Sequence, residues 1–210
     1  MTMPTGFPGG FDAGSEPADL QAWMRMQLFE RRIVSLTGDL DDEAANSVGV
    51  ALMTLDATGD DPVQLQIDSG DGTVAAALAI VDIVDLLGVP VRTSCIGQVA
   101  GPAIVVLAVG SHRSVSPHTR LRLFEPPVEV QGHARQVEQL AAMHLDRWQV
   151  FCARLSEATG QPVDRIREDA ARGRFFSAEE AVAYGLADEV ASPDARLYQL
   201  PGRPIGFAPR

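Results

Sequence analysis

Residues 63–87 read VQLQIDSGDGTVAAALAIVDIVDLL, and this stretch decides the fold class. Its opening residues alternate apolar and glutamine side chains, which is typical of a strand with one buried face. A glycine-rich turn follows at 69–72, and residues 73–87 form an apolar segment long enough for a buried helix. A strand that leads directly into a buried helix predicts an α/β fold with a largely parallel sheet.

The alternation of strand and helix continues on both sides of that stretch. Further strands are predicted at 32–36, 90–96 and 121–124. Helices are predicted after the acidic start at 41–43, at 101–109, at 132–159 with Gly160 as the stop, and after the capping box Ser177–Glu180. We therefore predict a single α/β domain over 28–192, with a flexible segment at 1–27 before it and a tail at 193–210 after it.

The composition narrows the class of protein further. The chain has 210 residues with 46% hydrophobic content, enough for one domain, and its net charge of −11 argues against nucleic-acid binding. Cys95 and Cys152 lie far apart without metal-ligand spacing, which favours a reducing compartment. No apolar run has the length of a membrane span, and the N-terminal stretch lacks the features of a signal peptide. We expect a cytoplasmic protein with no membrane or nucleic-acid partner.

One short motif suggests a cofactor, but its context argues against one. Residues 70–75, GDGTVA, fit the G-x-G-x-x-A pattern of dinucleotide-binding turns. That fold needs an acidic residue near the end of the next strand, whereas residues 95–97 are Cys, Ile and Gly. We predict no cofactor and no metal, and we assign these glycines to tight backbone geometry.

Six stretches resemble, in order and spacing, the proteolytic subunits of the Clp protease family. Together they extend over roughly residues 28–190, and no single one of them is decisive. They are LTGDLDDEAAN at 36–46, IDSGDGTV at 67–74, CIGQVA at 95–100, TGQP at 159–162, FSAEEA at 176–181 and YGLAD at 184–188.

This resemblance implies a crotonase-like α/β domain with a protruding handle, made of a strand and a long helix, at about 128–159. In that family, handles interlock two seven-membered rings into a hollow tetradecamer. The implied chemistry is ATP-dependent peptide hydrolysis, with an unfoldase ATPase docked on the ring.

The resemblance also implies where a Ser-His-Asp triad would lie, and this chain departs from it at each position. Gly101 stands at the nucleophile position, Phe124 at the histidine position and Gly173 at the aspartate position. A glycine has no side chain to attack a carbonyl, and a phenyl ring cannot take up a proton. We predict that the triad is absent.

A fourth departure concerns the oxyanion hole, for which the family uses two backbone N–H groups. The resemblance places these at Gly72, which is retained, and at Pro102, which has no N–H to donate. Losing one such donor costs on the order of 100–1000-fold in rate even where a triad is intact.

The surface on which the ATPase docks is also altered. The resemblance places family aromatic residues at Gln64, Gln66 and Ser114, and polar side chains there predict weak or indirect docking. Near the C-terminus, Ile205-Gly206-Phe207 is similar to the apolar-Gly-Phe tip that partner ATPases insert. One hypothesis is that this tail docks into a neighbouring ring; the alternative is a frayed terminus.

We therefore predict a non-catalytic Clp proteolytic subunit that assembles into rings, alone or with an active paralogue, and modulates protein degradation. One alternative is an active peptidase with a relocated nucleophile, for which the candidates are Ser94, Ser111 and Ser114, with His112 or His118 as base. We expect these five side chains to be solvated or bonded locally, and His144 to be packed. A second alternative is a crotonase-like acyl-CoA enzyme, against which Pro102 argues.

Overall fold

A seven-stranded, largely parallel sheet forms the centre of the molecule in a computed structural model that describes residues 17–127 and 133–192. The main path runs in the order β1 (Ile33–Thr37), β2 (Val63–Ser69), β3 (Val91–Ala100), β4 (His112–Val115) and β7 (Glu189–Val190), and all its pairs are parallel. Strand β5 (Arg120–Leu123) pairs in parallel with the end of β3, and β6 (Arg174–Phe176) pairs antiparallel to β5. The predicted α/β class is confirmed.

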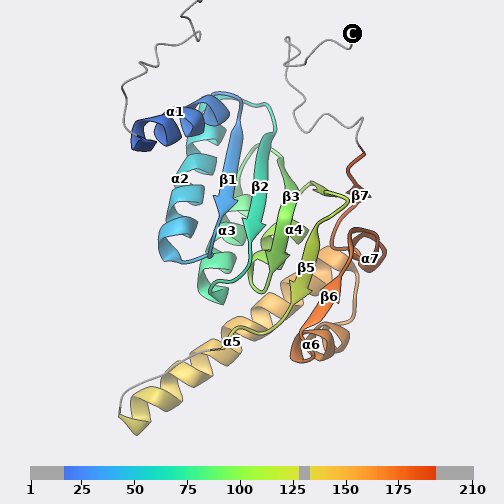
Figure 1. Ribbon diagram of the computed structural model, residues 1–210. Helices are drawn as coiled ribbons and strands as arrows, with labels where there is room; N and C mark the ends of the chain where they lie inside the picture. Colours follow the sequence, from blue (N-terminus) through green and yellow to red (C-terminus); the bar gives the residue numbers. More distant parts are fainter. Residues whose placement is uncertain (1–16, 128–132, 193–210) are drawn as a thin grey trace, which may run out of the picture.

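Helices α2 (Asp42–Thr58), α3 (Val74–Leu86) and α4 (Ala103–Ala108) lie on one face of this sheet (Figure 1). The short helices α6 (Val163–Ala171) and α7 (Ala178–Tyr184) lie beside β6 and β7. Strand β2 shows why the sheet has two unlike faces: Val63, Leu65 and Ile67 are buried toward the helices, while the intervening polar residues are not.

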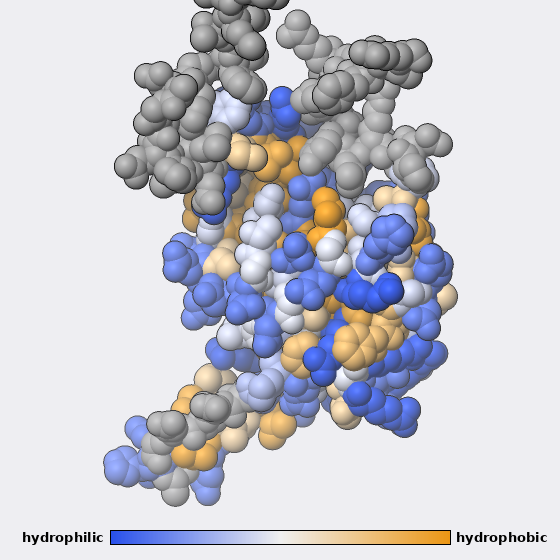
Figure 2. Space-filling model, viewed as in Figure 1, coloured by the Kyte–Doolittle hydropathy of each residue, from blue (hydrophilic) through white to orange (hydrophobic). Residues whose placement is uncertain are grey.

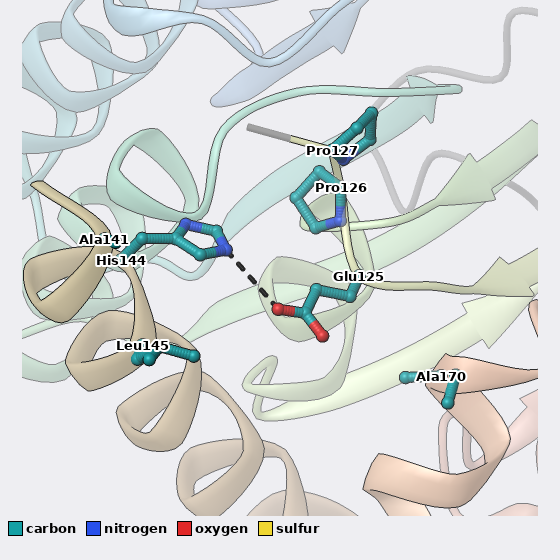
Figure 3. A pocket seen from close by; sticks show the side chains of 8 residues that line it. Glu125, Pro126, Pro127, Ala141, His144, Leu145 and Ala170 are labelled. Atoms are coloured by element: carbon teal, nitrogen blue, oxygen red, sulfur yellow. Dashed lines mark ion pairs between the residues drawn. The ribbon is translucent and has the colours of Figure 1, made fainter. Parts of the chain in front are cut away.

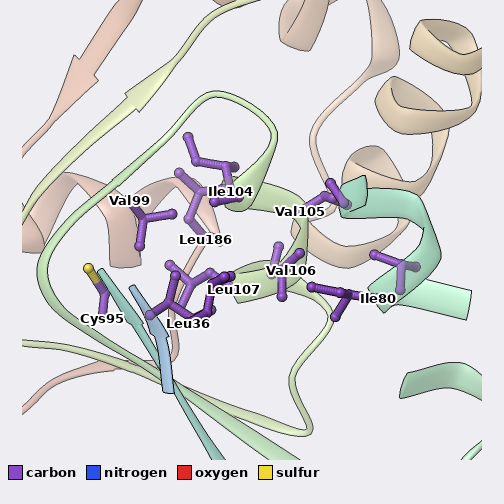
Figure 4. Packing of buried hydrophobic residues seen from close by; sticks show 14 of the residues in the cluster. Leu36, Ile80, Cys95, Val99, Ile104, Val105, Val106, Leu107 and Leu186 are labelled. Carbon is purple, nitrogen blue, oxygen red and sulfur yellow. The ribbon is translucent and has the colours of Figure 1, made fainter. Parts of the chain in front are cut away.

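The core is densest around α4, which follows β3 and is buried along its whole length. Figure 4 shows Ile104, Val106 and Leu107 of this helix packed among Leu36 of β1, Val99 of β3 and Leu186. A helix that is apolar on every side belongs in the interior, as the sequence predicted for this segment. This packing fixes the end of β3, and with it Gly101 and Pro102.

Helix α5 (Ala134–Thr159) is the longest element and projects from the domain (Figure 1). Its C-terminal part packs on the core through Trp148, Phe151 and Leu155, and it ends at Gly160, which has a positive φ of 72°. Its projecting part carries exposed apolar side chains among hydrophilic ones (Figure 2). The helix corresponds to the helical part of the expected handle; residues 128–132 lie outside the described part of the chain.

Helix α1 (Pro17–Phe29) extends over part of the segment at 1–27 that we expect to be flexible, and the sequence analysis did not predict this helix. The Gly- and Pro-rich stretch before it dominated that assignment, whereas residues 17–29 begin with proline and continue with helix-forming Leu, Met and Gln. Within the described residues, no helix is long and apolar enough to cross a membrane.

Candidate functional site

Gly101 and Phe124 face each other so closely that a side chain at 101 has no room. Gly101 directly follows β3 with a positive φ of 54°, and its N–H donates to the Arg122 carbonyl at 2.9 Å. A Cβ on Gly101 would lie 2.9 Å from Cζ of Phe124 and 3.1 Å from its Cε1. The structure thus brings the expected nucleophile and histidine positions together, and the phenyl ring fills the space between them.

Pro102, the expected position of an oxyanion donor, is buried and occupies the position just before α4. Because proline has no N–H, the backbone offers no donor at the position after Gly101. Its φ of −62° suits the start of a helix, so local structure accounts for the residue at this position.

The second expected oxyanion donor, the N–H of Gly72, already has an acceptor. It donates to Oδ1 of Asp71 at 2.7 Å, which places a carboxylate oxygen against this N–H. The glycine itself is required by close packing, because a Cβ at this position would lie 2.5 Å from the carbonyl oxygen of Leu40. Leu40 and Gly72 form a parallel β-bridge between the two loops, so a structural role accounts for Gly72.

Gly173, the expected aspartate position, lies between α6 and β6 with a positive φ of 63°. A Cβ there would lie 3.2 Å from Nη2 and 3.6 Å from Nε of Arg122. The three expected triad positions therefore lie around one arginine, Arg122. The sequence did not predict this residue as part of the site.

Arg122 is held between two phenyl rings. Its Cζ lies 4.7 Å from the ring centroid of Phe124 and 5.0 Å from that of Phe175. Phe175 comes from β6, where it is the register partner of Arg122. Strand alternation offered a signal for this arginine, since residues 122 and 124 point to the same side of an extended chain. Phe175 could be placed only once the β5–β6 pairing was known.

A pocket of about 550 Å³ lies between the segment after β5 and helix α5 (Figure 3). His144 of α5 and Glu125 point toward each other across it, with Nε2 and Oε1 3.4 Å apart. The side chain of His144 is 20% exposed, so it packs as expected, but the sequence did not predict its acidic partner. The other lining residues are Pro126, Pro127, Ala141, Leu145, Ala170 and Ala171.

Gln64, Gln66 and Ser114 lie on the face of the sheet opposite α2, α3 and α4. Gln66 of β2 is the register partner of Ser94 in β3, and Ser94 is the register partner of Ser114 in β4. Gln66, Ser94 and Ser114 therefore form one row across the sheet. Gln64 donates through Nε2 to Oγ of Ser94 at 3.0 Å. The expected docking positions thus share one sheet face, and the side chains they present there are polar.

Two of the three candidate replacement nucleophiles, Ser94 and Ser111, are bonded elsewhere. Ser94 accepts from Gln64, and Ser111 Oγ donates to the Val91 carbonyl at 2.9 Å. His112 Nε2 lies 3.1 Å from Oε1 of Glu189. Within residues 17–127 and 133–192, no serine hydroxyl hydrogen-bonds to a histidine ring, so this part of the chain contains no preformed Ser-His pair.

The two thiols are also poor nucleophiles. Cys95 and Cys152 are free and buried. Burial raises the pKa of the Cys95 thiol to about 12 and that of the Cys152 thiol to about 11. Because the thiolate is the reactive form, both groups are inert at neutral pH.

Among the described residues, no group of three or more His, Cys, Asp or Glu side chains is placed to hold a metal ion. The tail residues Ile205, Gly206 and Phe207 lie outside the described residues.

Comparison with known proteins agrees with this architecture. The family model described as Clp protease matches residues 18–194. The chain is 39% identical to the ATP-dependent Clp protease proteolytic subunit 4 of Rhodococcus jostii (strain RHA1), over 79% of this chain and 87% of that protein. It is 37% identical to the proteolytic subunit 2 of Chlamydia muridarum (79% of this chain, 83% of that protein) and 38% identical to that of Thermobifida fusca (78% and 82%). With a match across nearly the whole α/β domain, the chain belongs to the Clp protease family.

Proposed function

We propose that this chain is a non-catalytic proteolytic subunit of a Clp protease, which assembles into rings and modulates ATP-dependent protein degradation. The observation that carries the proposal is the contact between Gly101 and Phe124. The phenyl ring lies 2.9 Å from the position that a Cβ at residue 101 would occupy. An acyl-transfer site would need a hydroxyl and an imidazole in this volume.

The surrounding groups supply no substitute for the missing chemistry. A serine peptidase needs a nucleophile, a base that takes its proton, a carboxylate that orients the base, and N–H donors for the oxyanion. At the corresponding positions, Gly101, Phe124 and Gly173 offer none of the first three, and Pro102 offers no donor. The N–H of Gly72 donates to the carboxylate of Asp71, which occupies the remaining donor.

The handle helix supports an assembly role. Leu140, Met143 and Val150 of α5 are 42%, 43% and 55% exposed, although the helix projects away from the core of its own domain. Apolar side chains clustered on a projecting helix favour burial against another copy or a related subunit. The relatives carry the name proteolytic subunit, which agrees with a role as one part of a larger particle. The assembly that we propose is a heptameric ring, alone or mixed with an active paralogue.

The sheet face supports weak contact with an ATPase. Gln64 and Gln66 present amides where an apolar loop would have to dock, and burying an amide without a partner is costly. In the proposed particle, ATPase docking therefore takes place mainly on the active paralogue.

The test is native mass spectrometry of the purified chain, alone and co-expressed with the active Clp subunit of the same host, followed by peptide-cleavage assays. We expect rings that do not cleave a fluorogenic peptide and do not react with a fluorophosphonate probe, together with mixed rings on co-expression. The active subunit, assayed in parallel, is the positive control. Labelling of any serine in the pure chain would contradict the proposal, and peptide mapping of the adduct would identify the nucleophile.

A further inference from the structure

We propose that Arg122, which contacts the rings of Phe124 and Phe175, is the anchor of a carboxylate-binding site that holds peptides on the surface beside the expected triad positions. The inference deepens the proposed function and rests on it, because it assigns a task to a site that does not cleave. Its ligand is defined by chemistry: a peptide carboxylate, either at the chain end or on an Asp or Glu side chain.

The guanidinium of Arg122 is restrained before any ligand binds. Its Cζ lies 4.7 Å and 5.0 Å from the centroids of the Phe124 and Phe175 rings, so the group is held on two aromatic surfaces. Cation–π contacts use the face of a guanidinium and leave the N–H groups at its edge free for hydrogen bonds. An arginine restrained in this way loses less side-chain entropy when a ligand binds.

The guanidinium of Arg122 has no anionic partner among the described residues. This is so although the chain carries more acidic side chains (28) than basic ones (17). Arg113, Arg154 and Arg174 each form an ion pair with a carboxylate. For Arg122, the interactions within the part of the chain that the structure describes are the two ring contacts. Its charge is thus available to a ligand.

The exposure of Arg122 leaves one side of its guanidinium within reach of a ligand. The Nη2 and Nε atoms lie 3.2 Å and 3.6 Å from the position of a Cβ at Gly173, so this edge faces the Gly173 backbone, and even a small side chain there would press on it. The end formed by Nη1 and Nη2 is the other place at which a guanidinium accepts a carboxylate in bidentate geometry, and Arg122 is an exposed residue.

The surroundings favour a peptide over an inorganic anion. Phe175 is 64% exposed beside the guanidinium, and Figure 2 shows apolar surface over β6 among hydrophilic side chains. A ligand that places a carboxylate on Arg122 can therefore lay an adjacent apolar side chain against the exposed ring. A peptide that carries a carboxylate next to an apolar side chain satisfies both features.

The test uses saturation-transfer difference NMR with the full-length chain, because this method detects weak ligands of large assemblies. Three acetylated tripeptides serve as probes: Ala-Leu-Phe with a free C-terminal carboxylate, the same peptide with a C-terminal amide, and Ala-Glu-Phe with a C-terminal amide. We expect the amide of Ala-Leu-Phe to bind about tenfold more weakly than its free acid, since a charge-assisted pair is lost. Binding of the Glu peptide would show that side-chain carboxylates are also accepted, and binding of the free acid alone would restrict the site to chain ends; either result supports the site.

Variants decide whether Arg122 is responsible. Arg122→Gln should weaken binding of the free acid about tenfold, whereas Arg120→Gln, two residues away on the same strand and also exposed, should leave it unchanged. Gly173→Asp, which offers an internal carboxylate at a backbone conformation that aspartate tolerates, should also weaken it. Thermal melting confirms that each variant folds.

The inference is overturned if the acid and amide of Ala-Leu-Phe bind equally, or if Arg122→Gln binds like the wild type. An equal loss in Arg120→Gln would also overturn it, because the effect would then be one of general charge. Failure here is distinguishable from failure of the proposed function: peptide cleavage by the pure chain refutes the latter, whatever the binding results.

Discussion

At Gly101 two groups compete for one volume, which makes residues 101 and 124 interdependent. A Cβ at 101 would meet the Phe124 ring at 2.9 Å, and the backbone φ of 54° is one that side chains rarely adopt. A serine restored at 101 alone would therefore be strained and would face a phenyl ring in place of a base. Reversal of the proposed loss of function requires both positions to change together.

This interdependence gives the first prediction. Gly101→Ala should destabilise the chain by about 1–3 kcal/mol, because it combines a strained φ with overpacking against Phe124. Adding Phe124→Ala should remove the steric part, so that the double variant is more stable than the sum of the two single effects. Urea unfolding of the four proteins in a double-mutant cycle measures the coupling. Additive effects would show that the ring does not restrict residue 101.

A second interaction at the residue scale joins β4 to the ends of two helices. Arg113 donates to the carbonyls of Ala158 at 3.0 Å and Gly185 at 2.8 Å, and it forms an ion pair with Asp188. The Arg113 guanidinium and backbone N–H hold the pKa of the Asp188 carboxyl below its ordinary value. One side chain thus ties α5, α7 and β4 together.

The second prediction follows from that lowered pKa. In the unfolded chain Asp188 takes up its proton near pH 4, before the folded chain does, so the contribution of the pair is fully present above about pH 4. It is lost as the pH falls through the lower pKa of the folded state. Asp188→Asn should remove this part of the acid sensitivity, measured as unfolding free energy between about pH 5 and 3. Asp61→Asn, at an exposed loop position, is the control; equal pH profiles for both variants would contradict the assignment.

At the scale of elements, local sequence signals predicted the ends of helices well. The side chain of Thr73 caps α3, Gly160 ends α5 in the left-handed region, and Ser177 and Glu180 form the expected capping box of α7. Each signal is contained within a few residues, so no tertiary information was needed.

Elements with short or non-local determinants were missed. Strands β6 and β7 have three and two residues, too few for a periodic pattern to stand out. Strand β4 is as long as the predicted β5, but its sequence HRSV has a single apolar residue and lacks the alternation of RLRL in β5. The residues of the site likewise divide into those that the sequence identifies and those that only strand pairing brings together. Gly101, Phe124, Gly173 and Pro102 were identified from the resemblance, whereas Arg122 became prominent only when β5 paired with β6 and brought Phe175 beside it. Contacts of this kind depend on which strands are neighbours, which a single sequence does not specify.

The capping box of α7 supplies the third prediction. Ser177 Oγ accepts from the N–H of Glu180 at 3.2 Å, and Glu180 Oε2 accepts from the N–H of Ser177 at 2.8 Å. Ser177→Ala should lower the unfolding free energy by about 1 kcal/mol, and Ser177→Thr should cost less because threonine also caps. Chemical denaturation of both variants measures the difference. Equal losses would indicate that packing at this position, and not the hydroxyl, stabilises the helix start.

At the scale of the whole molecule, helix α5 exposes apolar side chains to water in an isolated chain, which is unfavourable in free energy. The N-terminal part of α5 extends beyond the domain, and most of the helix's side chains from Arg135 to Val150 are exposed. Leu140, Met143 and Val150 lie three and seven positions apart, so they share one side of the helix. A helix with an apolar side and no cover from its own domain is explained if assembly buries it.

The last prediction tests that explanation with matched charges. In Met143→Glu/Val150→Glu, two carboxylates enter the side of α5 that carries Leu140, Met143 and Val150. The proposed assembly of the wild type should then dissociate at protein concentrations at least about a hundredfold higher, because burying charges at an interface is costly. Ala142→Glu/Gln149→Glu adds the same charges to another, exposed side of the same helix segment and should assemble like the wild type. Native mass spectrometry across a dilution series measures both, and circular dichroism shows that the domain stays folded. Should the two double variants dissociate alike, net charge would be the cause; should neither dissociate, the apolar side of α5 would not be the interface. If only the first dissociates, the handle helix holds the particle together through its apolar side, independently of any chemistry in the cleft.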